Sequence, residues 1–135
     1  MTKVFLGGTC NGSQWREKLI PELRIDHFNP VVADWTPEAQ QEEIRQLEAC
    51  DFCLYVLTPK LLGFYAVAEI VDDSNKRPGK TLFTFLEEDE GATFEAHQAK
   101  SLRAVGELVA RNGGHTFQSL DEARDWLNAF AYHPA

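Results

Sequence analysis

The apolar run Phe52–Leu57 restricts the fold of this chain more than any other segment. Its sequence, FCLYVL, shows no alternation of apolar and polar residues. Such a continuous run is typical of a strand that is covered on both faces of a parallel sheet. We therefore expect 52–57 to be a central strand that ends at Thr58 and Pro59.

Other short apolar runs predict further strands around this one. The residues at 4–7 and 81–86 are interpreted as buried strands, 27–30 as a short strand and 115–117 as an edge strand. The acidic stretch 87–90 is expected to be a solvated loop.

Helical patterns lie between these runs. Thr36 and Pro37 predict a helix start, because a capping hydroxyl followed by a proline suits the first turn. This helix should reach about Ala49, with Ile44 and Leu47 on its buried face. The remaining helices are expected at 13–23 with Ser13 as a cap, at 63–73, at 93–111, and at 119–130 after a capping box at Ser119.

The regular alternation of strands and helices predicts the architecture. We expect residues 1–135 to form a single α/β domain with a flavodoxin-like, doubly wound parallel sheet of five strands in the order 2-1-3-4-5 and helices on both faces. In such sheets ligands bind beyond the carboxyl ends of the strands, at the switch point between strands 1 and 3. The loops at 7–13, 29–35 and 58–63 should therefore surround one pocket.

Charge and cysteine content narrow the class of partner. The net charge of −8 and the scattered basic residues argue against nucleic acid binding. The chain has only three cysteines, and an odd number cannot all be paired. This argues against a disulfide framework and favours a reducing compartment. The N-terminal apolar run is too short for a signal peptide, and no segment approaches the roughly 20 apolar residues of a membrane span. We expect a cytoplasmic protein without a membrane partner.

Few residues in the pocket loops can carry chemistry. Glu69 follows an apolar and aromatic segment, so its carboxylate should be partly desolvated and able to attack a sugar anomeric carbon. An ordinary exposed helix glutamate would show the same pattern. Asp34 and Trp35 could contact the sugar and base of a ligand. They could equally form the loop that enters the next helix, with the indole packed on the core. Gly7 and Gly8 either let a ligand approach the backbone or form a tight turn.

Several motifs, in their order and spacing, resemble the nucleoside 2-deoxyribosyltransferase-like family. The resemblance covers roughly residues 3 to 86 and rests on 4–9, Trp15, Asn29–Pro30, Asp34–Trp35, 49–51 and 68–70. Members of this family cleave the N-glycosidic bond of a 2'-deoxynucleoside with a glutamate nucleophile and pass the sugar to another base. Relatives pass the sugar to water and act as N-glycosidases.

The resemblance implies roles for particular residues. Glu69 would be the nucleophile, and substrate contacts would come from Gly7, Gly8, Thr9, Trp15, Asn29, Asp34, Trp35, Asp51 and Tyr65. Among these, the glycines and Thr9 would line the sugar side, Asn29, Asp34 and Trp35 would flank the base or sugar, Asp51 would support the site, and Tyr65 would orient the nucleophile. The resemblance also implies a small-molecule nucleoside or nucleotide as substrate, no cofactor or metal, and a homodimer or higher homo-oligomer.

Two other functions stay open on the sequence. One is a non-catalytic module of the same fold that binds a nucleotide or a protein partner. In that case the aromatic residues of the last helix (Trp126, Phe130 and Tyr132) would form a partner surface instead of core. The other is NAD glycohydrolysis, which a helix glutamate supports in a related α/β architecture.

Overall fold

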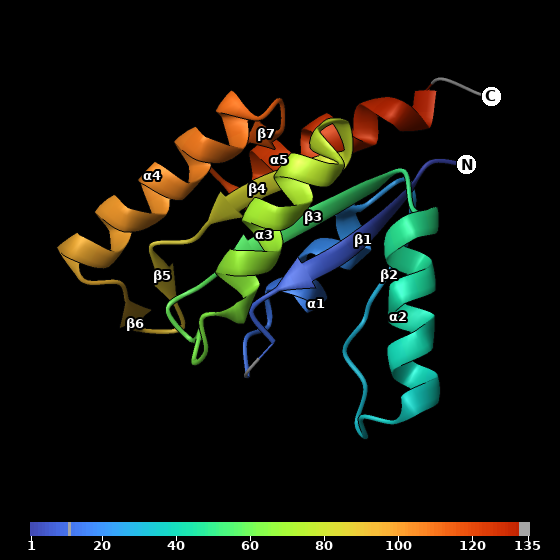
Figure 1. Ribbon diagram of the computed structural model, residues 1–135, viewed down its shortest axis with the longest axis horizontal. Coiled ribbons are helices and arrows are strands. Elements are labelled where there is room, and N and C mark those ends of the chain that lie inside the picture. The colour runs from blue at the N-terminus through green and yellow to red at the C-terminus, as the bar shows by residue number, and fades with distance from the viewer. Residues whose placement is uncertain (11, 133–135) are drawn as a thin grey trace.

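The strand β3 (Phe52–Leu57) lies at the centre of the sheet, as its apolar run predicted. The computed structural model describes residues 1–10 and 12–132. Within them the strands follow the order β2-β1-β3-β4-β7, and all neighbouring pairs are parallel (Figure 1). The other four strands are β1 (Lys3–Gly8), β2 (Asp26–Phe28), β4 (Thr81–Phe85) and β7 (His115–Thr116). This is the flavodoxin-like, doubly wound fold expected from the sequence.

Helices cover both faces of this sheet (Figure 1). On one face lie α1 (Trp15–Leu19), its 3-10 continuation Ile20–Glu22, α5 (Leu120–Asn128) and the 3-10 turn Ala129–Tyr132. On the other face lie α2 (Pro37–Ala49), α3 (Tyr65–Lys76) and α4 (Ala96–Arg111). The sheet side chains alternate between two hydrophobic clusters, so that Leu54 packs on the first face and Tyr55 on the second. No helix among the described residues is long and apolar enough to cross a membrane.

The aromatic residues that end the chain pack against the sheet. The ring of Trp126 lies 5.0 Å from that of Phe52 and 5.1 Å from that of Phe130. Both Trp126 and Phe130 are partly buried against the cluster under α1 and α5. The structure therefore favours core packing for these two residues, and the side chain of Tyr132 lies outside the described residues. The predicted cap of α5 is confirmed, because the Ser119 hydroxyl accepts a hydrogen bond from the backbone N–H of Glu122.

A small hairpin replaces the solvated loop expected at 87–90. Strands β5 (Glu88–Asp89) and β6 (Ala92–Thr93) form an antiparallel pair after β4. Asp89 is buried and accepts a 2.6 Å hydrogen bond from the hydroxyl of Ser13. The expectation that Ser13 caps α1 is also wrong: Gln14 holds the cap position, and its side chain makes no capping hydrogen bond. Ser13 is used to fix the hairpin to the loop after β1.

We expect Ser13→Ala to lower the free energy of unfolding by about 1.5 kcal/mol at pH 7, because a buried hydrogen bond to a charged group is lost. Burial by itself would raise the pKa of Asp89, but hydrogen bonds from Ser13 and Thr58 and the charge of Lys60 hold it below the ordinary 3.8. The stabilisation is therefore present above the unfolded pKa and disappears as the pH falls through the folded one. Urea unfolding at neutral and acidic pH measures it.

The matched control for this experiment is Ser101→Ala, which removes an exposed hydroxyl from α4. Its effect should stay within about 0.5 kcal/mol. A loss for Ser13→Ala that is as large in acid as at pH 7 would show that the hydroxyl does not act through the Asp89 carboxylate.

Helix α2 stands off the sheet and buries no residue completely (Figure 1). Its start agrees with the sequence, since the Thr36 hydroxyl accepts a hydrogen bond from the backbone N–H of Ala39. Its buried face was predicted only in part: Leu47 is partly buried, but Ile44 is 54% exposed. The amphipathic pattern predicts a helix whose apolar stripe packs against the sheet. In the structure the apolar stripe of α2 faces an open hollow instead.

Candidate functional site

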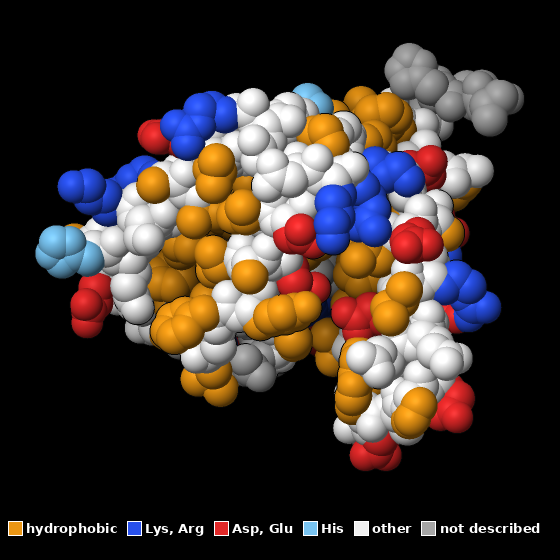
Figure 2. Space-filling model, in the orientation of Figure 1, with side chains coloured by type: hydrophobic (Ala, Val, Ile, Leu, Met, Phe, Trp, Pro, Cys, Tyr) orange, Lys and Arg blue, Asp and Glu red, His pale blue; other side chains and the backbone are white. Residues whose placement is uncertain are grey.

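A cavity of about 340 Å³ opens at the carboxyl ends of β1 and β3. Its lining comes from the end of β1 and the loop after it, from α1, the β2–α2 loop, α2, β3 and α3. An adjoining hollow of about 360 Å³ extends it along the space between α2 and α3. Figure 2 shows this space between the arm formed by α2, at the lower right, and the body of the molecule. The position is the switch point of the sheet, where this fold places ligands.

Glu69 projects from the second turn of α3 into this cavity. It is partly buried, and it also borders the hollow between α2 and α3. Burial raises the pKa of Glu69 above its ordinary value, and the carboxylates of Glu43 and Asp73 raise it further. A desolvated carboxylate at the wall of a ligand-sized cavity is the arrangement that nucleophilic catalysis at a sugar requires.

The two glycines of β1 serve the sheet as well as the cavity. Gly8 has a φ of +108°, and a Cβ there would lie 2.1 Å from the backbone oxygen of Val56. A Cβ on Gly7 would lie 3.0 Å from the ring of Tyr55. Gly8 thus permits a backbone conformation and a close approach that other residues cannot adopt, while Gly7 leaves room for the tyrosine ring beside the cavity.

Arg16 lies in the cavity wall, although its side chain comes from α1. It is only 2% exposed, and its guanidinium donates to the carbonyl oxygens of Leu6 at 3.0 Å, Thr9 at 2.7 Å and Gly8 at 3.4 Å. The ring of Trp15 lies 4.4 Å from the guanidinium carbon. Burial lowers the pKa of Arg16, but a guanidinium stays charged in proteins. It is therefore a fixed positive charge beside the cavity.

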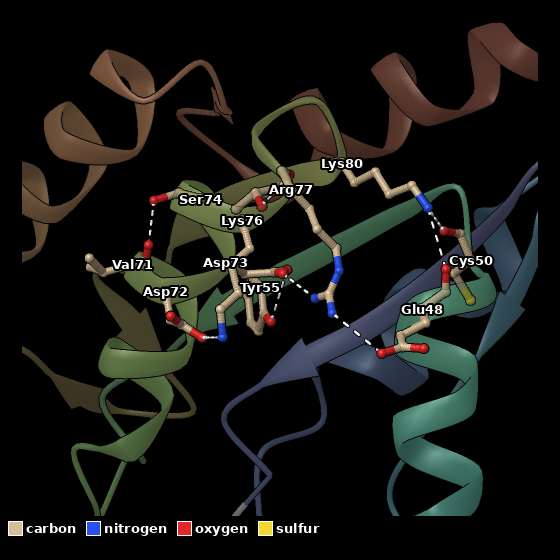
Figure 3. Close-up of polar contacts among 11 residues, drawn as sticks. Glu48, Cys50, Tyr55, Val71, Asp72, Asp73, Ser74, Lys76, Arg77 and Lys80 are labelled. Carbon is tan, nitrogen blue, oxygen red and sulfur yellow. Dashed lines mark hydrogen bonds and ion pairs between the residues drawn. The ribbon is translucent and has the colours of Figure 1, made fainter.

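A polar chain borders the hollow between α2 and α3 and ties α3 to α2 (Figure 3). The Tyr55 hydroxyl donates to Asp73 at 3.3 Å, and the other oxygen of Asp73 accepts from Arg77 at 2.5 Å. Arg77 reaches on to Glu48 at 3.9 Å, while Lys80 donates to the Cys50 carbonyl at 3.2 Å. Burial raises the pKa of Tyr55, so its hydroxyl keeps its proton. These contacts fix the carboxyl end of α2 to the rest of the protein. They do not reach the earlier turns of α2, which line the cavity.

Four of the predicted site residues line the cavity: Glu69, Gly7, Gly8 and Trp35. Trp35 is 60% exposed, which leaves its indole accessible at the mouth. Thr9 and Trp15 lie directly behind the wall. The Thr9 hydroxyl accepts from the backbone N–H of Thr58 at 3.0 Å, and the Trp15 indole donates to the Thr9 carbonyl at 2.8 Å.

The other predicted residues lie elsewhere. Asn29 is exposed and accepts from the backbone N–H of Val31 at 3.1 Å, and Asp34 is exposed in the same loop. Tyr65 is 77% exposed and borders only the hollow between α2 and α3. Asp51 lies at the amino end of β3, where it accepts from the backbone N–H of Lys3 at 2.9 Å. The structure therefore separates Asp51 from the cavity by the length of the strand.

Arg16, Glu43 and Tyr55 are among the cavity residues that were not singled out from the sequence. Glu43 precedes Leu47 by one helical turn and shares its face of α2, so a charged residue on an inward stripe was the available signal. Tyr55 alternates to the α3 face of β3. Nothing in the spacing indicates that Arg16 turns back under the loop after β1. The described residues contain no group of His, Cys, Asp or Glu side chains arranged to hold a metal ion.

Comparison with known proteins identifies one family. The family described as nucleoside 2-deoxyribosyltransferase like matches the chain over residues 1–77. Every residue of the cavity falls within this segment. A larger surface hollow of about 720 Å³, beside β4, α4 and the start of α5, lies outside it. No curated protein matches the chain.

Proposed function

The chain belongs to the nucleoside 2-deoxyribosyltransferase-like family, and from that premise we propose that it transfers or hydrolyses at the N-glycosidic bond of a (deoxy)nucleoside or nucleotide, with Glu69 as the nucleophile. The family match supports a role related to nucleoside glycosyl transfer. The observation that carries the specific proposal is the partly buried carboxylate of Glu69 in the wall of the switch-point cavity.

The proposed reaction has two steps. An oxygen of the Glu69 carboxylate attacks C1' of the sugar, and the electron pair of the C1'–N bond leaves with the base. The resulting glycosyl ester is then opened by water or by a second base, and Glu69 is released. In this arrangement Gly7 and Gly8 would face the sugar, and the exposed indole of Trp35 would stack on the base.

We also propose that the protein acts as a homo-oligomer. Large apolar side chains are exposed at the cavity and at the start of α3: Trp35, which lines the cavity, at 60%, and Phe64 and Tyr65 at 84% and 77%. A second copy of the chain over this mouth would remove apolar surface from water and close the site. The chain is proposed to form a single domain and to work in the cytoplasm, which its unpaired cysteines fit. Light scattering of the purified protein measures the oligomeric state.

The test of the function is a chromatographic screen for free base released from deoxynucleosides, deoxynucleotides and NAD, with and without an acceptor base. Release that depends on Glu69 and exchanges with the acceptor would establish a transferase, and release into water alone a hydrolase. Release of nicotinamide from NAD alone would instead indicate a glycohydrolase. Ligand binding by calorimetry without turnover on any substrate would overturn the proposal and favour a binding module.

A further inference from the structure

The sheet has an open edge beside the end of β4. Strand β7 pairs with β4 only as far as Phe83, whereas β4 continues to Phe85. In a parallel strand the backbone groups of alternate residues point to the same side. The Phe83 carbonyl accepts from the N–H of Phe117 on the β7 side at 2.9 Å, so the N–H and C=O of Phe85 point to that side too. Leu86, by contrast, donates its N–H to the Leu57 carbonyl of β3 at 2.9 Å.

The chain leaves this edge directly after Phe117. The Thr84 hydroxyl donates to the Phe117 carbonyl at 2.8 Å, and α5 begins at Leu120. Among the described residues no hydrogen bond reaches the N–H or the C=O of Phe85. Phe85 therefore presents one free donor and one free acceptor, which is how an unpaired strand edge offers itself to another chain.

The open edge lies in the surface hollow of about 720 Å³ beside β4. Helix α4, which packs over β4 and β7, forms one wall with Leu102 and Gly106 (Figure 1). The segment that leads into α5 forms the other wall with Phe117 and Leu120. Phe85 and Phe117 are only partly buried, so apolar surface remains for a ligand. A strand added here would have a helix on each face, as the inner strands of the sheet do.

Gly106 keeps the α4 wall low. A glycine in the interior of a helix is destabilising relative to alanine. A Cβ at this position would lie 3.6 Å from the Phe83 ring and 3.7 Å from the Thr116 methyl group, which are ordinary contact distances. Packing within the chain therefore does not require a glycine. Because Gly106 lines the hollow, a longer side chain there would occupy the space.

The rim of the hollow is acidic. Its lining includes the carboxylates of Glu87, Glu88 and Glu107. It also includes one guanidinium, that of Arg103, which lies 3.5 Å from Glu87. Among the described residues neither Glu88 nor Glu107 forms an ion pair. The rim thus favours a cationic ligand over a phosphate, and over a further copy of a chain whose net charge is −8.

We propose that this hollow binds an extended, basic segment of a partner protein, which adds a strand to the sheet at the edge of β4. The backbone of the segment accepts from the N–H of Phe85 and donates to its C=O. Side chains of an extended segment alternate between two faces, so apolar ones pack on Phe85 and Phe117 while a lysine or arginine pairs with Glu107. This binding does not depend on the proposed function.

The probe for the test is a fluorescein-labelled peptide of alternating valine and lysine. Its anisotropy should rise with added protein, and a peptide with glutamate in place of lysine should bind at least about tenfold more weakly. Amide hydrogen exchange measured by NMR locates the site. The N–H of Phe85 should exchange quickly in the free protein and slowly with the peptide, whereas the N–H of Leu86, already paired with Leu57, should be protected in both.

Two variants change the hollow in different ways. Gly106→Leu fills it with a side chain that suits a helix, and it should weaken binding of the lysine peptide at least about tenfold. Glu107→Lys reverses the charge of the rim, and its effect should be similarly about tenfold. The matched control is Glu38→Lys, which makes the same change of charge at an exposed position of α2 and should stay within about twofold. Circular dichroism checks that each variant is folded.

Several results would overturn the proposal. Equal affinity for the two peptides would remove the role of charge, and unchanged exchange at Phe85 would remove the added strand. Protection of Phe85 that increases with protein concentration, without peptide, would show that a second copy of the chain covers this edge. Protection by a deoxynucleotide instead of the peptide would assign the hollow to a phosphate ligand. None of these measurements involves base release, so their outcome is independent of Glu69.

Discussion

Glu69→Gln is expected to lower the rate of base release at least roughly 10³-fold while leaving ligand binding in place. The amide has nearly the same shape as the carboxylate, but it cannot form the glycosyl ester with C1'. With the wild type, a rapidly quenched reaction should contain protein whose mass is increased by one deoxyribosyl group, located on the peptide that carries Glu69. The Gln variant should show no such adduct. Quenched-flow kinetics and intact-mass measurement follow both quantities.

Although Glu69→Gln should lower the rate of base release, it should raise the free energy of unfolding over part of the pH range. Because the pKa of Glu69 is raised in the folded state by burial, and then by Glu43 and Asp73, the fold favours the protonated carboxyl. Its favourable contribution is complete below the ordinary pKa of 4.5 and is lost as the pH rises through the folded pKa. Glutamine does not titrate, so the Gln variant should gain stability relative to the wild type over that pH range. Urea unfolding at a series of pH values measures the crossover.

The control on the same helix is Asp72→Asn, which removes an exposed carboxylate whose partner is Lys76 at 2.9 Å. It should change neither the rate nor the pH dependence of stability beyond small surface effects. A Gln variant that still releases base at a rate near that of the wild type would remove Glu69 from the reaction. If the two proteins differ in free energy of unfolding by the same amount at every pH, the carboxylate of Glu69 is not desolvated in the folded state.

The fold could be predicted because the apolar runs have no second interpretation. Phe52–Leu57 is apolar throughout, so only a central strand buries it fully, and strict alternation with helices then gives a parallel sheet. The hairpin β5–β6 was missed because its acidic sequence is typical of a solvated loop. Groups distant in the sequence, the hydroxyls of Ser13 and Thr58 and the charge of Lys60, make burial of Asp89 favourable. A contact between residues 76 positions apart leaves no local signal.

The site residues that lie near the carboxyl ends of the strands could be predicted from the order of elements in the chain. Those whose position depends on the orientation of α2 could not. Gly7 and Gly8 end β1, and Glu69 lies on the helix after β3, so the switch-point rule places them together. Asp34 and Trp35 are neighbours in one loop, yet only the indole lines the cavity. Glu43 enters the site because α2 tilts away from the sheet, held at its carboxyl end by Arg77 and Lys80 (Figure 3). Helical periodicity reports which residues share a face, but not what that face meets.

Arg16→Met is the substitution expected to cost the most stability, about 3 kcal/mol or more. The guanidinium donates to the carbonyl oxygens of Leu6, Gly8 and Thr9, and each hydrogen bond from a charged donor contributes roughly 1.5–3 kcal/mol. The Thr9 oxygen keeps the indole N–H of Trp15 as a partner, so the net loss falls on the other two. Methionine fills a similar volume without a donor. Urea unfolding with an unchanged m-value measures the effect.

Two further variants show whether the stabilisation by Arg16 comes from its positive charge or from the several N–H donors of its guanidinium. Arg16→Lys keeps a positive charge but cannot reach several carbonyls in one plane, so it should recover only part of the stability. Lys18→Met, an exposed change on the same helix, should stay within about 0.5 kcal/mol. Without Arg16 the pKa of Glu43 should rise further, because that charge is what opposes the effect of burial. A Met variant as stable as the wild type would show that these carbonyls need no charged donor. If the prediction holds, one side chain fixes the loop after β1 and also supplies the positive charge beside the cavity.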